Sequence, residues 1–235
     1  MNKTFIMYFF GRPEPWIDKY IESVKLLAKD NWNWLMFTDN DMPNTKNFKT
    51  VKMDLEGFKD KIQEKFGVRP NYHLNEKNEM QSLSYAPALG YMFSEYLKDV
   101  DFWGYTNLDV VYGDLSHYLP DSLLETIDIF GNDPDDTCGP FTLLRNTKEV
   151  NELFLEAPDW PVCLTDGGNY GFDEQGFSRT VKKARDEGRL RVKFEFWQSH
   201  GYNPKLHREG KKLFDDLKGE EIMMFHFNRE KKWPL

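Results

Sequence analysis

Two mostly apolar runs near the start of the chain limit its fold more than any other feature. They cover residues 4–10 and 32–38, and such runs are typical of strands buried on both faces of a sheet. Between them, apolar residues recur at helical spacing over residues 17–28, just after Pro15. A shorter strand is expected at residues 48–53. The order predicts an α/β fold with a mixed, mostly parallel central sheet flanked by helices, in which ligands bind beyond the carboxyl ends of strands.

The rest of the chain alternates short helices and strands, and no repeat or strong linker divides it. We therefore expect one domain over residues 1–235, with a nucleotide-binding part at 1–114 and an acceptor-side and C-terminal part at 115–235. The further expected elements are a helix at 79–97 kinked or split by Pro87, strands at 102–105, 110–112, 126–130 and 141–144, a helix at 147–155 capped by Thr147, a loop at 159–171, a helix from Asp173 or Ser178 to Gly188, and strands at 192–197 and 222–227.

Composition excludes several classes of protein. With 31 basic and 39 acidic residues the net charge is −8, and no basic cluster suits a nucleic-acid backbone. The two cysteines, Cys138 and Cys163, lack zinc-site spacing and are expected to be free thiols in a reducing compartment. No apolar run reaches the roughly 18 residues of a membrane span, and no signal-peptide pattern is present. We expect a cytoplasmic protein, in a bacterium or in the host if the source is a virus.

The expected strand at 102–105 leads to an acidic centre, Asn107-Leu108-Asp109. Residues two apart on an extended chain point the same way, so Asn107 and Asp109 are expected to share a face. Their oxygens are ligands that Mg²⁺ or Mn²⁺ prefers, with open positions left for a diphosphate. From spacing alone the alternative is a turn or a helix cap after a strand.

Residues 102–114, FWGYTNLDVVYGD, resemble the metal-binding segment of glycosyltransferases with the GT-A (nucleotide-diphospho-sugar transferase) fold. They are most similar to a bacterial and viral family of polysaccharide-building transferases, whose Asp-x-Asp falls here on Asn107 and Asp109. The resemblance implies that Asp109 bonds the metal directly, while Asn107 replaces an aspartate that contacts the ribose or the metal. It extends to residues 84–93, where Ser84 and Ala86 replace the Asp and Lys of the family, and to residues 143–154 and 225–233.

The C-terminal segment resembles that of glycogenin-like enzymes, in which a histidine is the third metal ligand and a later lysine contacts the diphosphate. The resemblance assigns these roles to His226 and Lys232, six positions apart. An imidazole suits such a site, and a lysine offsets the charge of a leaving diphosphate. The alternative for His226 is a packed strand-end histidine. The remaining histidines, His73, His117, His200 and His207, are expected to be surface or packing residues.

Two further groups complete the candidate site. Asp173 and Glu174 follow a glycine-rich loop, and similar acidic pairs in GT-A enzymes lie beside the transferred sugar. A helix N-terminus would equally favour them. At the ends of the first two strands, nucleotide contacts are expected from Phe10, Gly11, Arg12, Thr38 and Asp39, with ordinary turns as the alternative.

The combined features predict a hexosyl- or pentosyltransferase that uses Mn²⁺ or Mg²⁺. It would move a sugar from a nucleotide-sugar donor, most simply a UDP-sugar, to a glycan or another hydroxyl acceptor. One rival is a nucleotide-sugar hydrolase or nucleotidyltransferase, but the latter would carry a longer glycine-rich, basic loop than the one that begins at Gly11. The other rival is a non-catalytic carbohydrate- or nucleotide-binding protein with a decayed transferase site, a reading that Asn107, Ser84 and Ala86 support.

Overall fold

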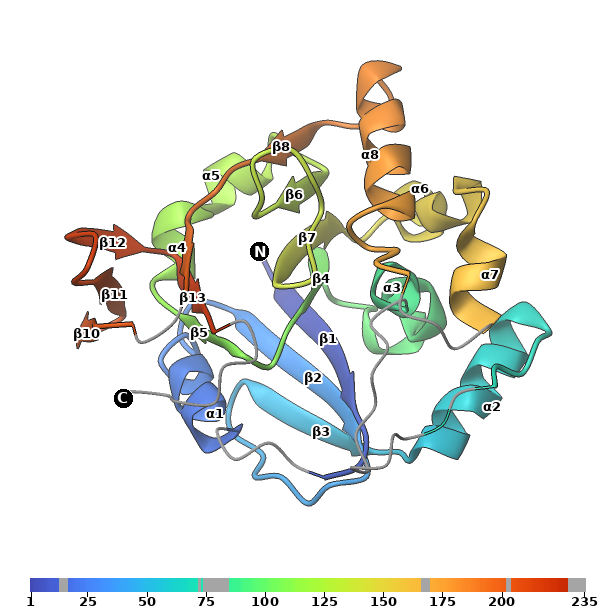
Figure 1. The fold of residues 1–235 in the computed structure, drawn as a ribbon, viewed down its shortest axis with the longest axis horizontal. Helices are drawn as coiled ribbons and strands as arrows, with labels where there is room; N and C mark the ends of the chain where they lie inside the picture. Colours follow the sequence, from blue (N-terminus) through green and yellow to red (C-terminus); the bar gives the residue numbers. More distant parts are fainter. Residues whose placement is uncertain (13–16, 72, 74–84, 166–169, 202–203, 228–235) are drawn as a thin grey trace.

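A seven-stranded sheet forms the centre of the molecule (Figure 1). The computed structural model describes the chain except for residues 13–16, 72, 74–84, 166–169, 202–203 and 228–235. In spatial order the strands are β3 (Phe48–Lys52), β2 (Trp32–Thr38), β1 (Lys3–Phe9), β4 (Phe102–Thr106), β7 (Phe141–Arg145), β6 (Ile129–Gly131) and β8 (Val192–Phe194). Neighbours from β3 to β4 are parallel, β7 is antiparallel to β4 and β6, and β8 is parallel to β6. This confirms the expected mixed, mostly parallel sheet.

Helices cover both faces of this sheet and close two separate apolar cores. One core lies under α1 (Ile17–Lys25), α4 (Leu115–Tyr118) and α5 (Asp121–Leu124). The other lies under α2 (Leu55–Phe66), α3 (Leu89–Met92), α6 (Lys148–Glu152), α7 (Trp160–Thr165) and α8 (Gly176–Asp186), on the right of Figure 1. No helix in the described residues is both long and apolar enough to cross a bilayer.

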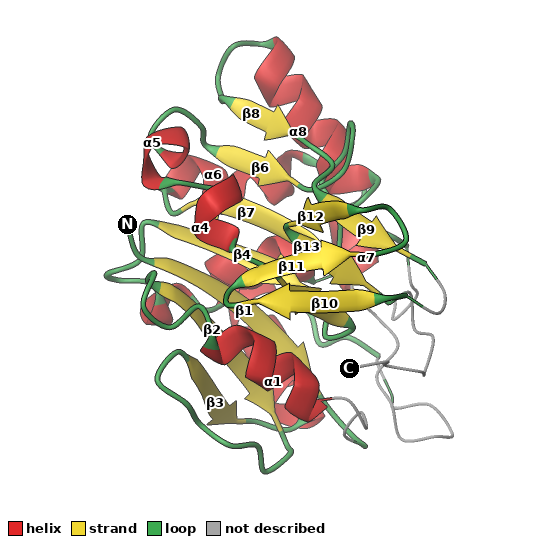
Figure 2. Cartoon of the chain, turned by 90° about the vertical axis from the view of Figure 1, so that its left-hand side faces the viewer, coloured by secondary structure: helices red, strands yellow, loops and turns green. Residues whose placement is uncertain are grey.

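Two small sheets lie over the first face (Figure 2). One is β5 (Val110–Tyr112), β13 (Met224–His226) and β9 (Gln198–His200), with β13 antiparallel to β5 and parallel to β9. The other is an antiparallel sheet of β10 (Leu206–Glu209), β11 (Lys212–Asp215) and β12 (Glu220–Ile222). The first small sheet brings residues 224–226 back to the segment that follows β4.

The structure corrects four expectations from the sequence. The strand expected at 192–197 ends at Phe194, and β9 then joins a different sheet. The strand expected at 222–227 is split at Met223, whose backbone bonds to Trp197 and Gly113 rather than to the ladder of β13. Helix α7 lies where a loop was expected, since Pro161 sits in its first turn, where a proline costs no hydrogen bond. The sheet β10–β12 was not expected at all.

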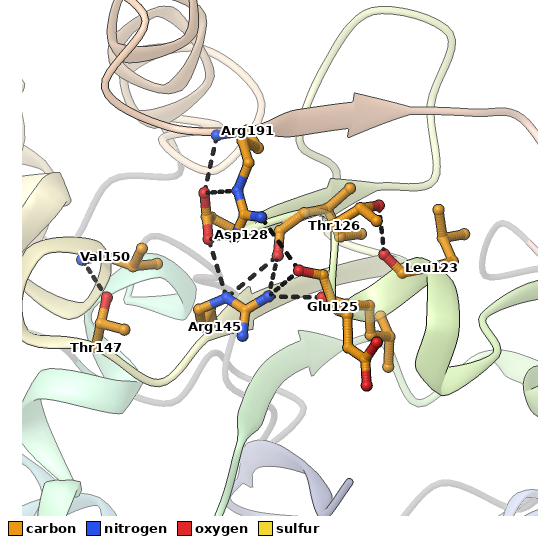
Figure 3. A network of polar contacts seen from close by, with 10 residues as sticks. Leu123, Glu125, Thr126, Asp128, Arg145, Thr147, Val150 and Arg191 are labelled. Atoms are coloured by element: carbon orange, nitrogen blue, oxygen red, sulfur yellow. Dashed lines mark hydrogen bonds and ion pairs between the residues drawn. The ribbon is translucent and has the colours of Figure 1, made fainter.

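A network of polar contacts centres on Asp128, Arg145 and Arg191 (Figure 3). Arg145 donates to Asp128 at 2.9 Å and lies over the ring of Phe102, the first residue of β4. Arg191, just before β8, also donates to Asp128. Burial alone would raise the pKa of Asp128, but the hydrogen bonds from the arginines outweigh it and lower the pKa. The network joins β7, β8 and the segment before β6.

The middle of β4 is fixed by close packing under α3. The fully buried ring of Trp103 lies against Gly90, and its indole N–H donates to Asn151 at 2.6 Å. A Cβ atom placed on Gly90 would be 2.2 Å from the Trp103 ring. Only glycine therefore fits at this helix position, and the fit sets where β4 delivers the residues that follow it.

We expect Gly90→Ala to destabilise the protein by about 1–3 kcal/mol, because a buried indole cannot move aside without strain. Gly57→Ala in α2 is the matched control. Its Cβ would lie 3.3 Å from the Asp54 carboxylate, and alanine exceeds glycine in helix propensity by up to about 1 kcal/mol. Urea denaturation of both variants measures the difference. If the two variants unfold at the same urea concentration, the contact between Gly90 and Trp103 is not tight.

Candidate functional site

The chain turns sharply where β4 ends, and this bend carries polar groups at the carboxyl end of an inner strand of the central sheet. Thr106 is the last residue of β4, and β5 begins at Val110. Between them, Leu108 packs against the core while Asp109 is only 8% exposed. A carboxylate this buried is costly unless it has a polar partner. One such partner is His226, which lies more than a hundred residues later in the sequence.

His226 reaches this bend because β13 pairs with β5. In the antiparallel register His226 lies opposite Val110, and the backbone N–H of Phe227 donates to the Asp109 carbonyl at 2.9 Å. The His226 Nε2 atom is 3.3 Å from Asp109 Oδ1 and 3.5 Å from Asn107 Nδ2, the nitrogen of the side-chain amide. The side chains of Asn107 and Asp109 therefore lie beside one imidazole, although His226 is 119 positions from Asn107.

Buried hydroxyl groups hold the bend from below. The Thr106 hydroxyl lies 2.6 Å from the Tyr112 hydroxyl and donates to the Pro140 carbonyl at 2.8 Å. The Tyr20 hydroxyl continues the chain, 3.3 Å from that of Tyr112. Burial raises the pKa of Tyr112 to about 12, so this group stays a neutral donor. These contacts between hydroxyl groups tie the end of β4 to the turn that contains Pro140.

The same turn brings Asp173 to the site. A Cβ on Gly139 would lie 2.8 Å from Asp173 Oδ2 and 3.4 Å from Asn107 Oδ1, so both side chains approach the one glycine. Asp173 is 4% exposed, and its backbone carbonyl accepts from the Thr137 hydroxyl at 2.5 Å. Burial, together with the neighbouring Glu174, raises the pKa of Asp173 from 3.8 to about 7. Glu174 itself is exposed, and both residues precede α8, which starts at Gly176.

The residues expected to contact a nucleotide lie at the carboxyl ends of β1 and β2, which are tied together. The backbone N–H of Gly11 donates to Asp39 at 3.0 Å, and the Asn40 amide donates to the Gly11 carbonyl at 2.8 Å. The side chains of Phe10 and Thr38 are fully buried. Phe10 packs against Phe58, so its side chain belongs to the core. Arg12 is exposed.

Some expected residues contribute differently or cannot be placed. Lys232 and Ser84 lie outside the described residues. Ala86 is buried in the core. Cys138 and Cys163 are both buried and form no disulfide. In the described part of the chain, no group of three or more His, Cys, Asp and Glu side chains could hold a metal ion, so a cation here would rely on Asp109, His226 and the Asn107 amide.

The sequence analysis set His200 aside as a surface or packing residue. The structure places it in β9, in register with His226 on the neighbouring strand β13. Partial burial of its ring, together with the nearby charges of His226 and Lys218, lowers its pKa. The only signal in the sequence is a histidine at a strand end before Gly201, and that pattern does not reveal which strand lies beside it.

Comparison with solved structures defines the fold. The galactosyltransferase LgtC, solved with donor and acceptor sugar analogues, matches 95% of this chain and 86% of its own, with a TM-score of 0.52 and 11% identity. Mouse xyloside xylosyltransferase 1 in its apo form matches all of both chains at a TM-score of 0.49 and 12% identity. The TM-score of the second match is too low to carry an argument. The sequence matches no curated protein.

The sheet order and the match to LgtC define the class: the chain has the GT-A fold of nucleotide-diphospho-sugar glycosyltransferases. Within that class, the chain belongs to a family of unknown function, DUF6625, whose model matches residues 5–231. At 11% identity the likeness to LgtC shows the fold alone, and the function must be argued from the site.

We expect Asp173→Asn to stabilise the protein at pH 8 by up to a few kcal/mol, at about 1.4 kcal/mol per pKa unit. The carboxyl has a pKa of about 7 in the folded chain against 3.8 normally. Folding therefore opposes ionisation of this carboxyl. The resulting loss of stability in the parent protein grows from pH 4 to pH 7 and stays constant above pH 7. At pH 4 the variant and the parent should be equally stable. Urea denaturation at both pH values measures this, and a gain that does not depend on pH would contradict the raised pKa.

Proposed function

We propose that this protein is a metal-dependent glycosyltransferase that moves a hexose or pentose from a nucleotide-sugar donor, most simply a UDP-sugar, to a hydroxyl group of a glycan or another acceptor. One observation carries the proposal: Asp109, His226 and Asn107 meet at the end of β4 in a chain with the GT-A fold. Ligands of open α/β sheets bind at this end of the strands, so the position and the chemistry of the three groups agree.

The residues present fit a divalent cation. The carboxylate and amide oxygens suit Mn²⁺ or Mg²⁺, and the imidazole nitrogen favours Mn²⁺, the softer of the two ions. Three protein ligands leave the other coordination positions of such an ion open for oxygens of a diphosphate and for water. When bound, such a cation would offset the negative charge that develops on the departing nucleoside diphosphate.

The other groups of the site divide between the nucleotide and the sugar. Gly11, Arg12, Thr38 and Asp39 lie at the ends of β1 and β2 or just after them, where we place the nucleoside. The resemblance to glycogenin-like enzymes gives Lys232 a contact with the diphosphate, but this residue lies outside the described part.

We place the transferred sugar next to Asp173, which approaches Gly139 and hence Asn107. With a pKa of about 7, this carboxyl can exchange a proton with an acceptor hydroxyl near neutral pH. Glu174 follows it, exposed at the surface. A carboxyl in this place suits either stereochemical outcome, so the proposal assigns neither inversion nor retention.

A second candidate function is binding of a nucleotide or a carbohydrate without transfer. Two features favour it: Asn107 stands where related transferases have an aspartate, and Ala86, where they have a lysine, is buried in the core. The two functions differ in turnover. A transferase slowly hydrolyses its donor when no acceptor is present, so a screen of nucleotide sugars for release of free sugar separates them and also identifies the sugar.

Calorimetry with UDP tests the proposal. We expect binding that requires Mn²⁺ or Mg²⁺ and that weakens at least about tenfold, or about 1.4 kcal/mol, in Asp109→Asn. This variant keeps the shape of the side chain but loses the carboxylate charge. Asp99→Ala removes an exposed carboxylate from the turn before β4 and serves as the control, with UDP affinity unchanged. Metal-independent binding, or equal affinity in Asp109→Asn, would contradict the proposal.

A further inference from the structure

Strand β9 adds one more polar side chain to the row that begins at Asp109. In the parallel pairing of β9 with β13, Gln198, Ser199 and His200 lie opposite Met224, Phe225 and His226. Paired residues on adjacent strands point to the same face and lie about 5 Å apart. His200 therefore extends from the same face as His226, one strand farther from β5. Figure 2 shows β9 and β13 in the same part of the molecule.

Buried hydrogen bonds hold β9 in this place. The Ser199 hydroxyl donates to Asp215 of β11, and both side chains are buried. The Gln198 amide donates to the Asn132 carbonyl at 3.1 Å, and the backbone N–H of Trp197 donates to the Asn132 side chain at 2.9 Å. The strand is therefore fixed from both sides, and the position of His200 is set before a ligand arrives.

The His200 imidazole is available to a ligand. The residue is exposed, and its ring meets Phe196 edge to face, with 5.9 Å between centroids. Among the described residues, no protein group forms a hydrogen bond with either ring nitrogen. A histidine on a fixed strand, open on its polar side, is suited to donate a hydrogen bond to a bound molecule.

The surroundings indicate an anion as that molecule. The basic neighbours that influence His200 are His226 and Lys218. Lys218 is ion-paired with Glu220, so the donors that the strand pairing places side by side are His226 and His200. An anionic group beside His226 would also lie near His200, and hydrogen bonds to charged groups are the stronger kind.

We propose that His200 is a phosphate-binding residue that donates a hydrogen bond to the diphosphate of the nucleotide held at Asp109 and His226. The inference rests on the proposed function, since it takes the diphosphate to lie beside His226. It extends the site by one strand, to a residue that neither the sequence motif nor the C-terminal segment includes.

The test is calorimetry on the full chain with Mg²⁺ and three probes: UDP, inorganic pyrophosphate and uridine. We expect His200→Ala to weaken UDP and pyrophosphate by about tenfold or more and to leave uridine unchanged. His200→Gln, which retains a donor, should recover part of the loss. His117→Ala, which removes an exposed histidine on α4, is the control and should match the parent.

The possible outcomes separate this inference from the proposed function. If UDP binds and depends on Asp109, but His200→Ala changes its affinity by less than twofold or weakens uridine equally, only the role of His200 is overturned. If pyrophosphate binding depends on His200 while UDP shows no dependence on Asp109, the phosphate contact stands and the transferase site fails. If neither UDP nor pyrophosphate binds to the parent protein, both are overturned.

Discussion

The pairing of β5 with β13 is the interaction on which the candidate site depends. A three-residue ladder and the bond from Phe227 N–H to the Asp109 carbonyl attach the end of the chain to the bend after β4. Each backbone hydrogen bond contributes only about 1 kcal/mol net, but burial of Met224 and Phe225 between two sheets adds apolar stabilisation. Without this pairing, Asp109 would be a buried carboxylate with no imidazole beside it.

The site places two buried carboxyl groups in different surroundings. Asp109 faces His226, whereas Asp173 has Glu174 as its charged neighbour and a pKa of about 7. Such a difference between two acids in one site is how enzymes assign them different roles. Asp109 is suited to holding positive charge and Asp173 to exchanging a proton. Gly139 keeps Asp173 close to Asn107 because it has no side chain to separate them.

Much of the fold could be predicted from local sequence patterns. The runs at β1 and β2 and the segment at β5 indicated strands at almost the observed bounds, because a strand buried on both faces needs apolar side chains at nearly every position. The Thr147 cap of α6 was confirmed. The sheet β10–β12 was missed because its strands are only three or four residues long and rich in charged residues, with no alternation of apolar and polar positions.

The site was less predictable, since its geometry depends on pairs far apart in the chain. Asp109 and His226 were found through their resemblance to known motifs, and the structure places them in contact. The roles of Gly139 and His200 depend on the path of the turn before β7 and on the register of β9. No local pattern encodes either of these. The switch of the chain between sheets at residues 195–197 likewise follows from tertiary packing.

The most direct test of the central claim is electron spin-echo spectroscopy of Mn²⁺ bound to the protein in the presence of UDP. If Asp109 and His226 hold a cation against the diphosphate, the spectrum will show modulation from an imidazole nitrogen. This modulation should vanish in His226→Ala and persist in His200→Ala. A spectrum without nitrogen modulation, or one that His226→Ala leaves unchanged, would contradict the account.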